Sequence, residues 1–100
     1  MNLSDTRAII TGGVSGLGFA VAQHIVAHGG KVALFDINSL KAAEAITSLG
    51  AGNAAYFSTD VSDEDQVAEN TANAAEFMGG LNAAINCAGI IGAGRVLGRE

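Results

Sequence analysis

The chain has 100 residues, of which 49% are hydrophobic and 15% are charged, and its formal net charge is −5. This size suggests a single domain with one core, and the composition argues against disorder. Only five Lys and Arg residues are present, which argues against binding nucleic acid or an anionic membrane through a basic face. One cysteine excludes an internal disulfide, no signal peptide is visible, and no apolar run approaches the roughly 20 residues that span a bilayer. We therefore expect a soluble, cytoplasmic protein.

Four short apolar runs predict β-strands, at Ala8–Thr11, Val32–Asp36, Ala54–Ser58 and Ala83–Cys87. Their apolar residues are continuous rather than alternating, which is typical of parallel strands covered on both faces. The segments between them predict three helices. The order of strands and helices, with short connections, favours an α/β fold with a doubly wound parallel sheet and strand order 3-2-1-4.

The first predicted helix runs from about Gly16 to His28. Leu17, Val21 and Ile25 form one apolar stripe, which we expect to face the core, and Phe19 and Val26 on the opposite side predict cover there too.

The second predicted helix, Ser39–Leu49, has Asn38 or Ser39 as its N-cap and Gly50 after its end. The third opens with a sequence similar to a capping box, from Ser62 to Asp65, and ends at Met78 before two glycines. The stretch from Gly89 to Glu100 is punctuated by glycines and predicts a loop.

A glycine-rich turn follows the first predicted strand and leads directly into the first helix. Gly12, Gly16 and Gly18 are spaced as Gly-x-x-x-Gly-x-Gly within Thr11–Gly18. Glycines at such a turn allow a tight backbone and close approach to a pyrophosphate, which the helix N-terminus attracts. No Gly-Lys-Ser/Thr follows, so the turn is not a P-loop.

Asp36 ends the second predicted strand, eighteen positions after Gly18. A carboxylate at this place can accept hydrogen bonds from an adenosine ribose, and it would repel a 2′-phosphate. The nearest basic residues, Lys31 and Lys41, lie a strand's length before it and a helical turn after it. The sequence therefore predicts NAD(H), rather than NADP(H), as the cofactor.

These motifs, together with Asp60-Val61 and Asn86-Cys87-Ala88-Gly89, resemble those of the short-chain dehydrogenase/reductase family, with Cys87 in place of the second Asn of its Asn-Asn-Ala-Gly motif. The resemblance implies a Rossmann fold. It also implies a set of cofactor-binding residues: Gly12, Ser15, Gly16, Leu17, Gly18, Asp36, Asp60, Val61, Asn86, Cys87, Ala88 and Gly89.

The resemblance further implies an oxidoreductase that interconverts a secondary alcohol and a ketone with NAD(H). The family's catalytic Ser, Tyr-x-x-x-Lys and helix Asn have no counterpart before Glu100, so we predict no catalytic residue here. Residues 1–100 are then the N-terminal, dinucleotide-binding half of one Rossmann-fold domain. The parent protein is expected to be a homo-oligomer acting on a small alcohol, ketone or acyl-CoA.

The motif around Cys87 is most similar to that of type II 3-hydroxyacyl-CoA dehydrogenases, which suggests conversion of 3-hydroxyacyl-CoA to 3-oxoacyl-CoA. Broad 3-oxoacyl or steroid-alcohol activity is a rival hypothesis. A non-catalytic nucleotide-binding or partner-binding module stays open as well. A fold that binds S-adenosylmethionine is a third possibility, against which the Asn86–Gly89 motif argues.

Other chemical groups are weaker candidates. His24 and His28 have a spacing that can bind zinc, but no third ligand is nearby in the sequence, so we predict no metal. Cys87 has no identifiable base, and both it and Tyr56 are expected to serve packing. Arg95 and Arg99 are expected to be solvated.

Overall fold

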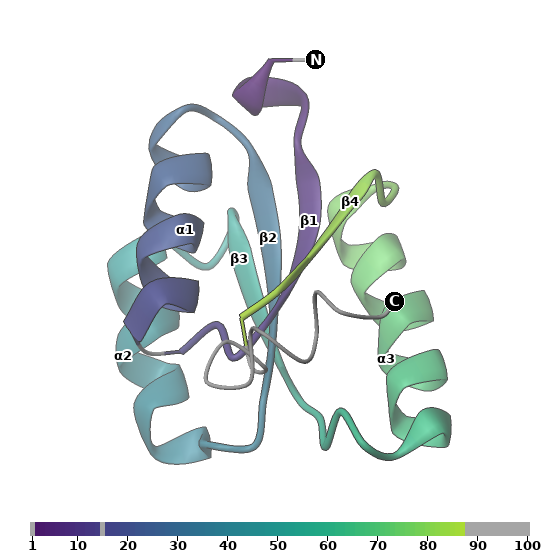
Figure 1. Cartoon of the computed structure of the whole chain (residues 1–100). Coiled ribbons are helices and arrows are strands. Elements are labelled where there is room, and N and C mark those ends of the chain that lie inside the picture. Colours follow the sequence, from purple (N-terminus) through teal and green to yellow (C-terminus); the bar gives the residue numbers. More distant parts are fainter. Residues whose placement is uncertain (1, 15, 88–100) are drawn as a thin grey trace, which may run out of the picture.

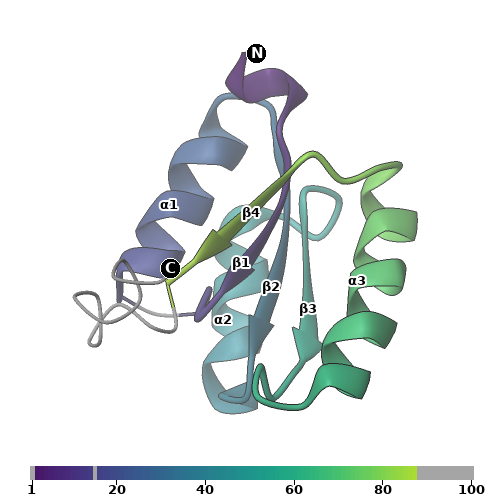
Figure 2. The same ribbon diagram turned by 45° about the vertical axis from the view of Figure 1, so that its right-hand side comes forward.

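The computed structural model describes residues 2–14 and 16–87. The chain forms a four-stranded parallel sheet in the order β3-β2-β1-β4, with β3 and β4 at its edges (Figure 2). The strands are β1 (Arg7–Thr11), β2 (Lys31–Asp36), β3 (Ala54–Ser58) and β4 (Ala83–Asn86), preceded by a short 3₁₀ helix at Leu3–Asp5. Helices α1 (Gly16–Ala27) and α2 (Ser39–Leu49) cover one face, and α3 (Glu64–Met78) covers the other (Figure 1). The predicted doubly wound α/β fold and its strand order are confirmed.

The sheet separates two apolar clusters. Ile10 and Leu34 belong to the cluster beneath α1 and α2, whereas Phe35 and Met78 belong to the one beneath α3. The prediction that every strand is covered on both faces is correct for the inner residues of β1 and β2, but wrong for the edges. In β4, half-buried and exposed residues alternate, because Ala83 and Ile85 pack against the cluster beneath α1 and α2, whereas Ala84 and Asn86 lie exposed on the opposite face.

The predicted core stripe of α1 is wrong in part. Gly18, Ala22 and Ile25 are the buried residues of this helix, whereas the Leu17 side chain is 54% exposed. The helix approaches the turn after β1 through Gly18, whose backbone lies against the carbonyl of Gly12. A glycine therefore occupies the place that the periodicity assigned to leucine. Phe19 and Val26 are half-buried and pack against this same core.

Helix α3 begins one residue later than the predicted capping box. Asp63 is its N-cap, and its Oδ1 atom accepts hydrogen bonds from the backbone N–H groups of Asp65 (3.0 Å) and Gln66 (3.2 Å). The Ser62 hydroxyl donates to the Asp60 carboxylate instead, at 2.6 Å. Both Ser62 and Asp63 are capable N-caps, and the bond to Asp60 decides between them.

Helix α2 begins and ends as predicted. The Asn38 side chain accepts a hydrogen bond from the Lys41 N–H at 3.3 Å, and Gly50 follows the helix with φ of 95°. No helix among the described residues is long and apolar enough to cross a bilayer. The loop predicted from Gly89 to Glu100 lies outside the described residues.

Candidate cofactor-binding site

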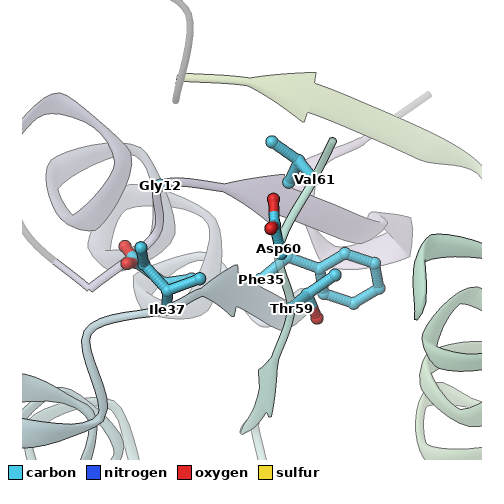
Figure 3. A pocket seen from close by; sticks show the side chains of 7 residues that line it. Gly12, Phe35, Ile37, Thr59, Asp60 and Val61 are labelled. Carbon is cyan, nitrogen blue, oxygen red and sulfur yellow. The ribbon is translucent and has the colours of Figure 1, made fainter. Parts of the chain in front are cut away.

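The segments that follow β1, β2 and β3 meet at the carboxyl edge of the sheet, where they enclose a pocket of about 150 Å³. Figure 3 shows Gly12 after β1, Ile37 after β2, and Asp60 and Val61 after β3. In a doubly wound sheet, this edge is where ligands bind. The structure thus brings together four residues that were predicted from the sequence, namely Gly12, Asp36, Asp60 and Val61. Among the described residues, the pocket is lined by Gly12, Phe35, Asp36, Ile37, Thr59, Asp60 and Val61.

Three lining residues were not predicted from the sequence as site residues, namely Phe35, Ile37 and Thr59. Phe35 and Thr59 are each 1% exposed, and the Thr59 hydroxyl donates to the Phe57 carbonyl at 2.7 Å. Ile37 is 72% exposed, and Val61, from the segment after β3, is 47% exposed. The sequence gives no signal that singles out Ile37, since isolated exposed apolar residues are common on protein surfaces.

The glycine-rich turn has the geometry that its sequence suggested. The Gly12 N–H donates to the Phe35 carbonyl at 2.8 Å, and Gly12 and Gly16 have φ values of 69° and 61°, which favour glycine. A Cβ atom at Gly18 would collide with the Gly12 carbonyl oxygen. The turn therefore delivers the N-terminus of α1, with its positive dipole end, beside the pocket. Ser15 lies outside the described residues.

Asp36 is anchored from two directions. Its Oδ1 atom accepts a hydrogen bond from the Asn38 N–H at 2.9 Å, and its Oδ2 atom accepts one from the Val14 N–H at 3.4 Å. The carboxylate is thus tied to the start of α2 and to the glycine turn. A carboxylate oxygen can accept more than one hydrogen bond, so this anchored group retains capacity for hydroxyl donors of a ligand.

Asp60 lies at the rim of the pocket, and its side chain is exposed. Its Oδ1 atom accepts hydrogen bonds from the Ser62 hydroxyl (2.6 Å) and the Ser62 N–H (3.0 Å). These two bonds lower the pKa of the Asp60 carboxyl below its usual value. The Asp60 N–H donates to the Gln66 side chain at 2.8 Å, which ties the rim to α3.

The carboxyl end of β4 lies beside the turn rather than in the pocket. The Thr11 hydroxyl donates to Asn86 Oδ1 at 2.8 Å, and the Cys87 N–H donates to the Thr11 carbonyl at 3.1 Å. Burial raises the pKa of the Cys87 thiol, which opposes a role as a thiolate nucleophile. Ala88 and Gly89 lie outside the described residues.

The two histidines are remote from this site. His24 on α1 and His28 directly after this helix are exposed, and the His28 Nδ1 atom donates to the His24 carbonyl at 2.8 Å. Within residues 2–14 and 16–87, no three His, Cys, Asp or Glu side chains lie close enough together to hold a metal ion.

Lys41 lies nearer to the glycine turn than its place in the sequence suggested. It lines a groove of about 400 Å³ between α1 and α2 together with Val14, Gly16 and Glu44. A cation is thus present on the α2 side of the turn, with a carboxylate in the same groove.

A family model described as short chain dehydrogenase matches residues 6–98, a span that includes the turn, the pocket and the end of β4. The chain belongs to the short-chain dehydrogenase family. The predicted resemblance is confirmed.

Among the short-chain dehydrogenases, the chain is 42% identical over 93 residues to the 2,5-dichloro-2,5-cyclohexadiene-1,4-diol dehydrogenase of Sphingobium indicum, covering 93% of this chain and 37% of that protein. It is 36% identical over 83 residues to the 3-hydroxyacyl-CoA dehydrogenase type-2 of Rattus norvegicus, covering 83% and 31% respectively. The crystal structure of the 3-ketoacyl-(acyl-carrier-protein) reductase from Brucella melitensis, complexed with NADH, superimposes with a TM-score of 0.76 at 27% identity, covering 82% of this chain and 34% of that one. The chain therefore spans about a third of the length of these short-chain dehydrogenases.

Proposed function

We propose that residues 1–100 form the N-terminal, NAD(H)-binding half of a Rossmann-fold domain, in a homo-oligomeric enzyme that interconverts a secondary alcohol and a ketone. The observation that carries the proposal is the Asp36 carboxylate, held at the pocket by Asn38 and Val14. A ribose with two free hydroxyls can donate to this anion, whereas a 2′-phosphate would place like charges together.

The pocket suits the adenosine half of the cofactor. Ile37 and Val61 are exposed apolar side chains that can cover the flat faces of an adenine, and Asp36 takes the ribose. The turn and the first residues of α1 can take the pyrophosphate. In this proposal the contacts come from Gly12, Ser15, Gly16, Leu17, Gly18, Asp36, Asp60 and Val61, with Asn86, Cys87, Ala88 and Gly89 on the nicotinamide side. The nicotinamide supplies the hydride chemistry when bound.

Calorimetric titration of the parent protein with NAD⁺ and with S-adenosylmethionine tests the proposed ligand. We expect binding of NAD⁺ alone. Binding of S-adenosylmethionine in its place would overturn the proposal. A Tyr-x-x-x-Lys sequence encoded beyond Glu100 would separate an enzyme from a non-catalytic nucleotide-binding module.

The 100-residue chain alone is expected to show no alcohol oxidation with NAD⁺ and to be poorly soluble or self-associated. Its edge strand β4 borders a groove of about 470 Å³ beside α1, lined mostly by apolar side chains such as Leu3, Ile25 and Ile85. Such an open edge favours aggregation. Light scattering and NADH absorbance measure both properties. A monodisperse monomer that oxidises an alcohol would contradict this prediction.

For the substrate, we propose a 3-hydroxyacyl-CoA. Support comes from the Asn86-Cys87 motif and from the 36% identity to a 3-hydroxyacyl-CoA dehydrogenase type-2. We expect the parent protein to reduce acetoacetyl-CoA with a higher kcat/KM than simple ketones. Steady-state rates for a panel of substrates provide the test. The panel includes a cyclic diol, whose oxidation with NAD⁺ is measured because of the similarity to a diol dehydrogenase. Equal rates for thioester and ketones would count against this substrate.

A further inference from the structure

Tyr56 makes a contact that the sequence did not indicate. It lies on β3 opposite Leu34 of β2, and its ring packs against the core beneath α1 and α2. The ring is half-buried, and the hydroxyl at its end donates to the backbone carbonyl of Asp36 at 2.7 Å. Tyr56 therefore contributes a polar contact as well as the packing predicted for it.

The Asp36 carbonyl accepts a second hydrogen bond, from the Thr59 N–H at 3.1 Å. Two donors from β3 and the segment after it therefore hold one carbonyl. That carbonyl belongs to the peptide between Asp36 and Ile37, both of which line the pocket. Fixing this peptide plane limits rotation of the backbone at the point where β2 turns toward α2.

We propose that Tyr56 is a positioning residue, which favours NAD(H) over NADP(H) by fixing the Asp36–Ile37 peptide beside the adenosine half of the cofactor. This inference rests on the proposed NAD(H) function. Tyr56 does not line the pocket, so it acts through Asp36, whose carboxylate discriminates between a ribose and its 2′-phosphate. Loss of the hydroxyl leaves the ring in the core and removes one of the two hydrogen bonds that hold the peptide.

The test compares the parent protein with its Tyr56→Phe variant in titrations with NAD⁺, NADP⁺ and ADP-ribose. We expect NAD⁺ and ADP-ribose to bind about two- to tenfold more weakly, since one hydrogen bond contributes that much to an equilibrium. We expect the ratio of the NADP⁺ and NAD⁺ dissociation constants to fall. A purely structural role would lower the melting temperature without changing this ratio.

Thr71→Val is the matched control, because the Thr71 hydroxyl donates to the Val67 carbonyl at 2.6 Å on α3, away from the pocket. It should leave all three affinities unchanged. In an Asp36→Ala background, Tyr56→Phe should no longer change the ratio. If the unmutated protein binds no NAD⁺, the proposed function itself fails. If it binds NAD⁺ and Tyr56→Phe changes neither affinity nor ratio, the role of Tyr56 is overturned.

A second measurement keeps the hydroxyl in place. Fluorotyrosine at position 56 should give a fluorine resonance that shifts when ADP-ribose is added and stays constant with nicotinamide mononucleotide. A resonance that responds to neither ligand, in a protein that binds NAD⁺, would overturn the proposal.

Discussion

Replacing Asp36 with alanine is expected to weaken NAD⁺ binding roughly ten- to hundredfold, because a hydrogen bond to a charged group is worth about 1.5–3 kcal/mol. NADP⁺ should bind the variant as well as or better than it binds the unmutated protein, since the charge that opposes its 2′-phosphate is gone. Titrations of both proteins with both cofactors measure the change. Asp65→Ala, which removes an exposed acid from the first turn of α3, is the matched control and should leave both affinities unchanged.

Substitution of Lys41 tests the alternative that the protein prefers NADP(H). It lines the groove that contains Val14 and Gly16, so it is the described cation best placed to favour a 2′-phosphate. We expect Lys41→Ala to leave NAD⁺ affinity unchanged. Tighter binding of NADP⁺ than NAD⁺ by the unmutated protein, lost in Lys41→Ala, would refute the assignment of NAD(H).

Gly18→Ala is expected to destabilise the fold by about 1–3 kcal/mol or more, the usual cost of overpacking a close contact. The added Cβ atom would collide with the Gly12 carbonyl oxygen, which belongs to backbone and cannot rotate away as a side chain can. Relief would require α1 to move from the sheet, and the turn would move with it. Both the melting temperature and NAD⁺ affinity should therefore fall.

Gly52→Ala is the matched control for this substitution. A Cβ atom at Gly52 would meet nothing within 4 Å, so the variant should unfold at nearly the temperature of the unmutated protein. If Gly18→Ala unfolds at that temperature too and binds NAD⁺ normally, the contact between α1 and the turn is less tight than the structure indicates.

The fold could be predicted because its information is local. Each apolar run is bounded by a glycine or polar connection, and short connections between parallel strands leave few topologies. The glycine turn and Asp36 could be predicted for the same reason, since the backbone conformation of Gly12 and the end of β2 depend on neighbouring residues.

The errors have a common physical cause, which is specific contacts that the type and periodicity of the residues do not encode. Periodicity could not reveal that α1 meets the turn after β1 at Gly18 and leaves Leu17 exposed, because this depends on the carbonyl of Gly12. The choice of Asp63 over Ser62 as N-cap depends on Asp60. Likewise, Tyr56 contacts Asp36 only because β3 pairs with β2 in one register.

Among the described residues, the pocket is lined between Gly12 and Val61, by the end of β2 and the segments after β1, β2 and β3, whereas β4 pairs with the other side of β1. In the proposed NAD(H) complex, the adenosine contacts therefore come from the first three strands and the segments after them, and the end of β4 lies on the nicotinamide side. Changes in β4 would then leave the proposed adenosine contacts intact. Such a separation agrees with the general rule that one fold can carry different functions in sites built on different segments.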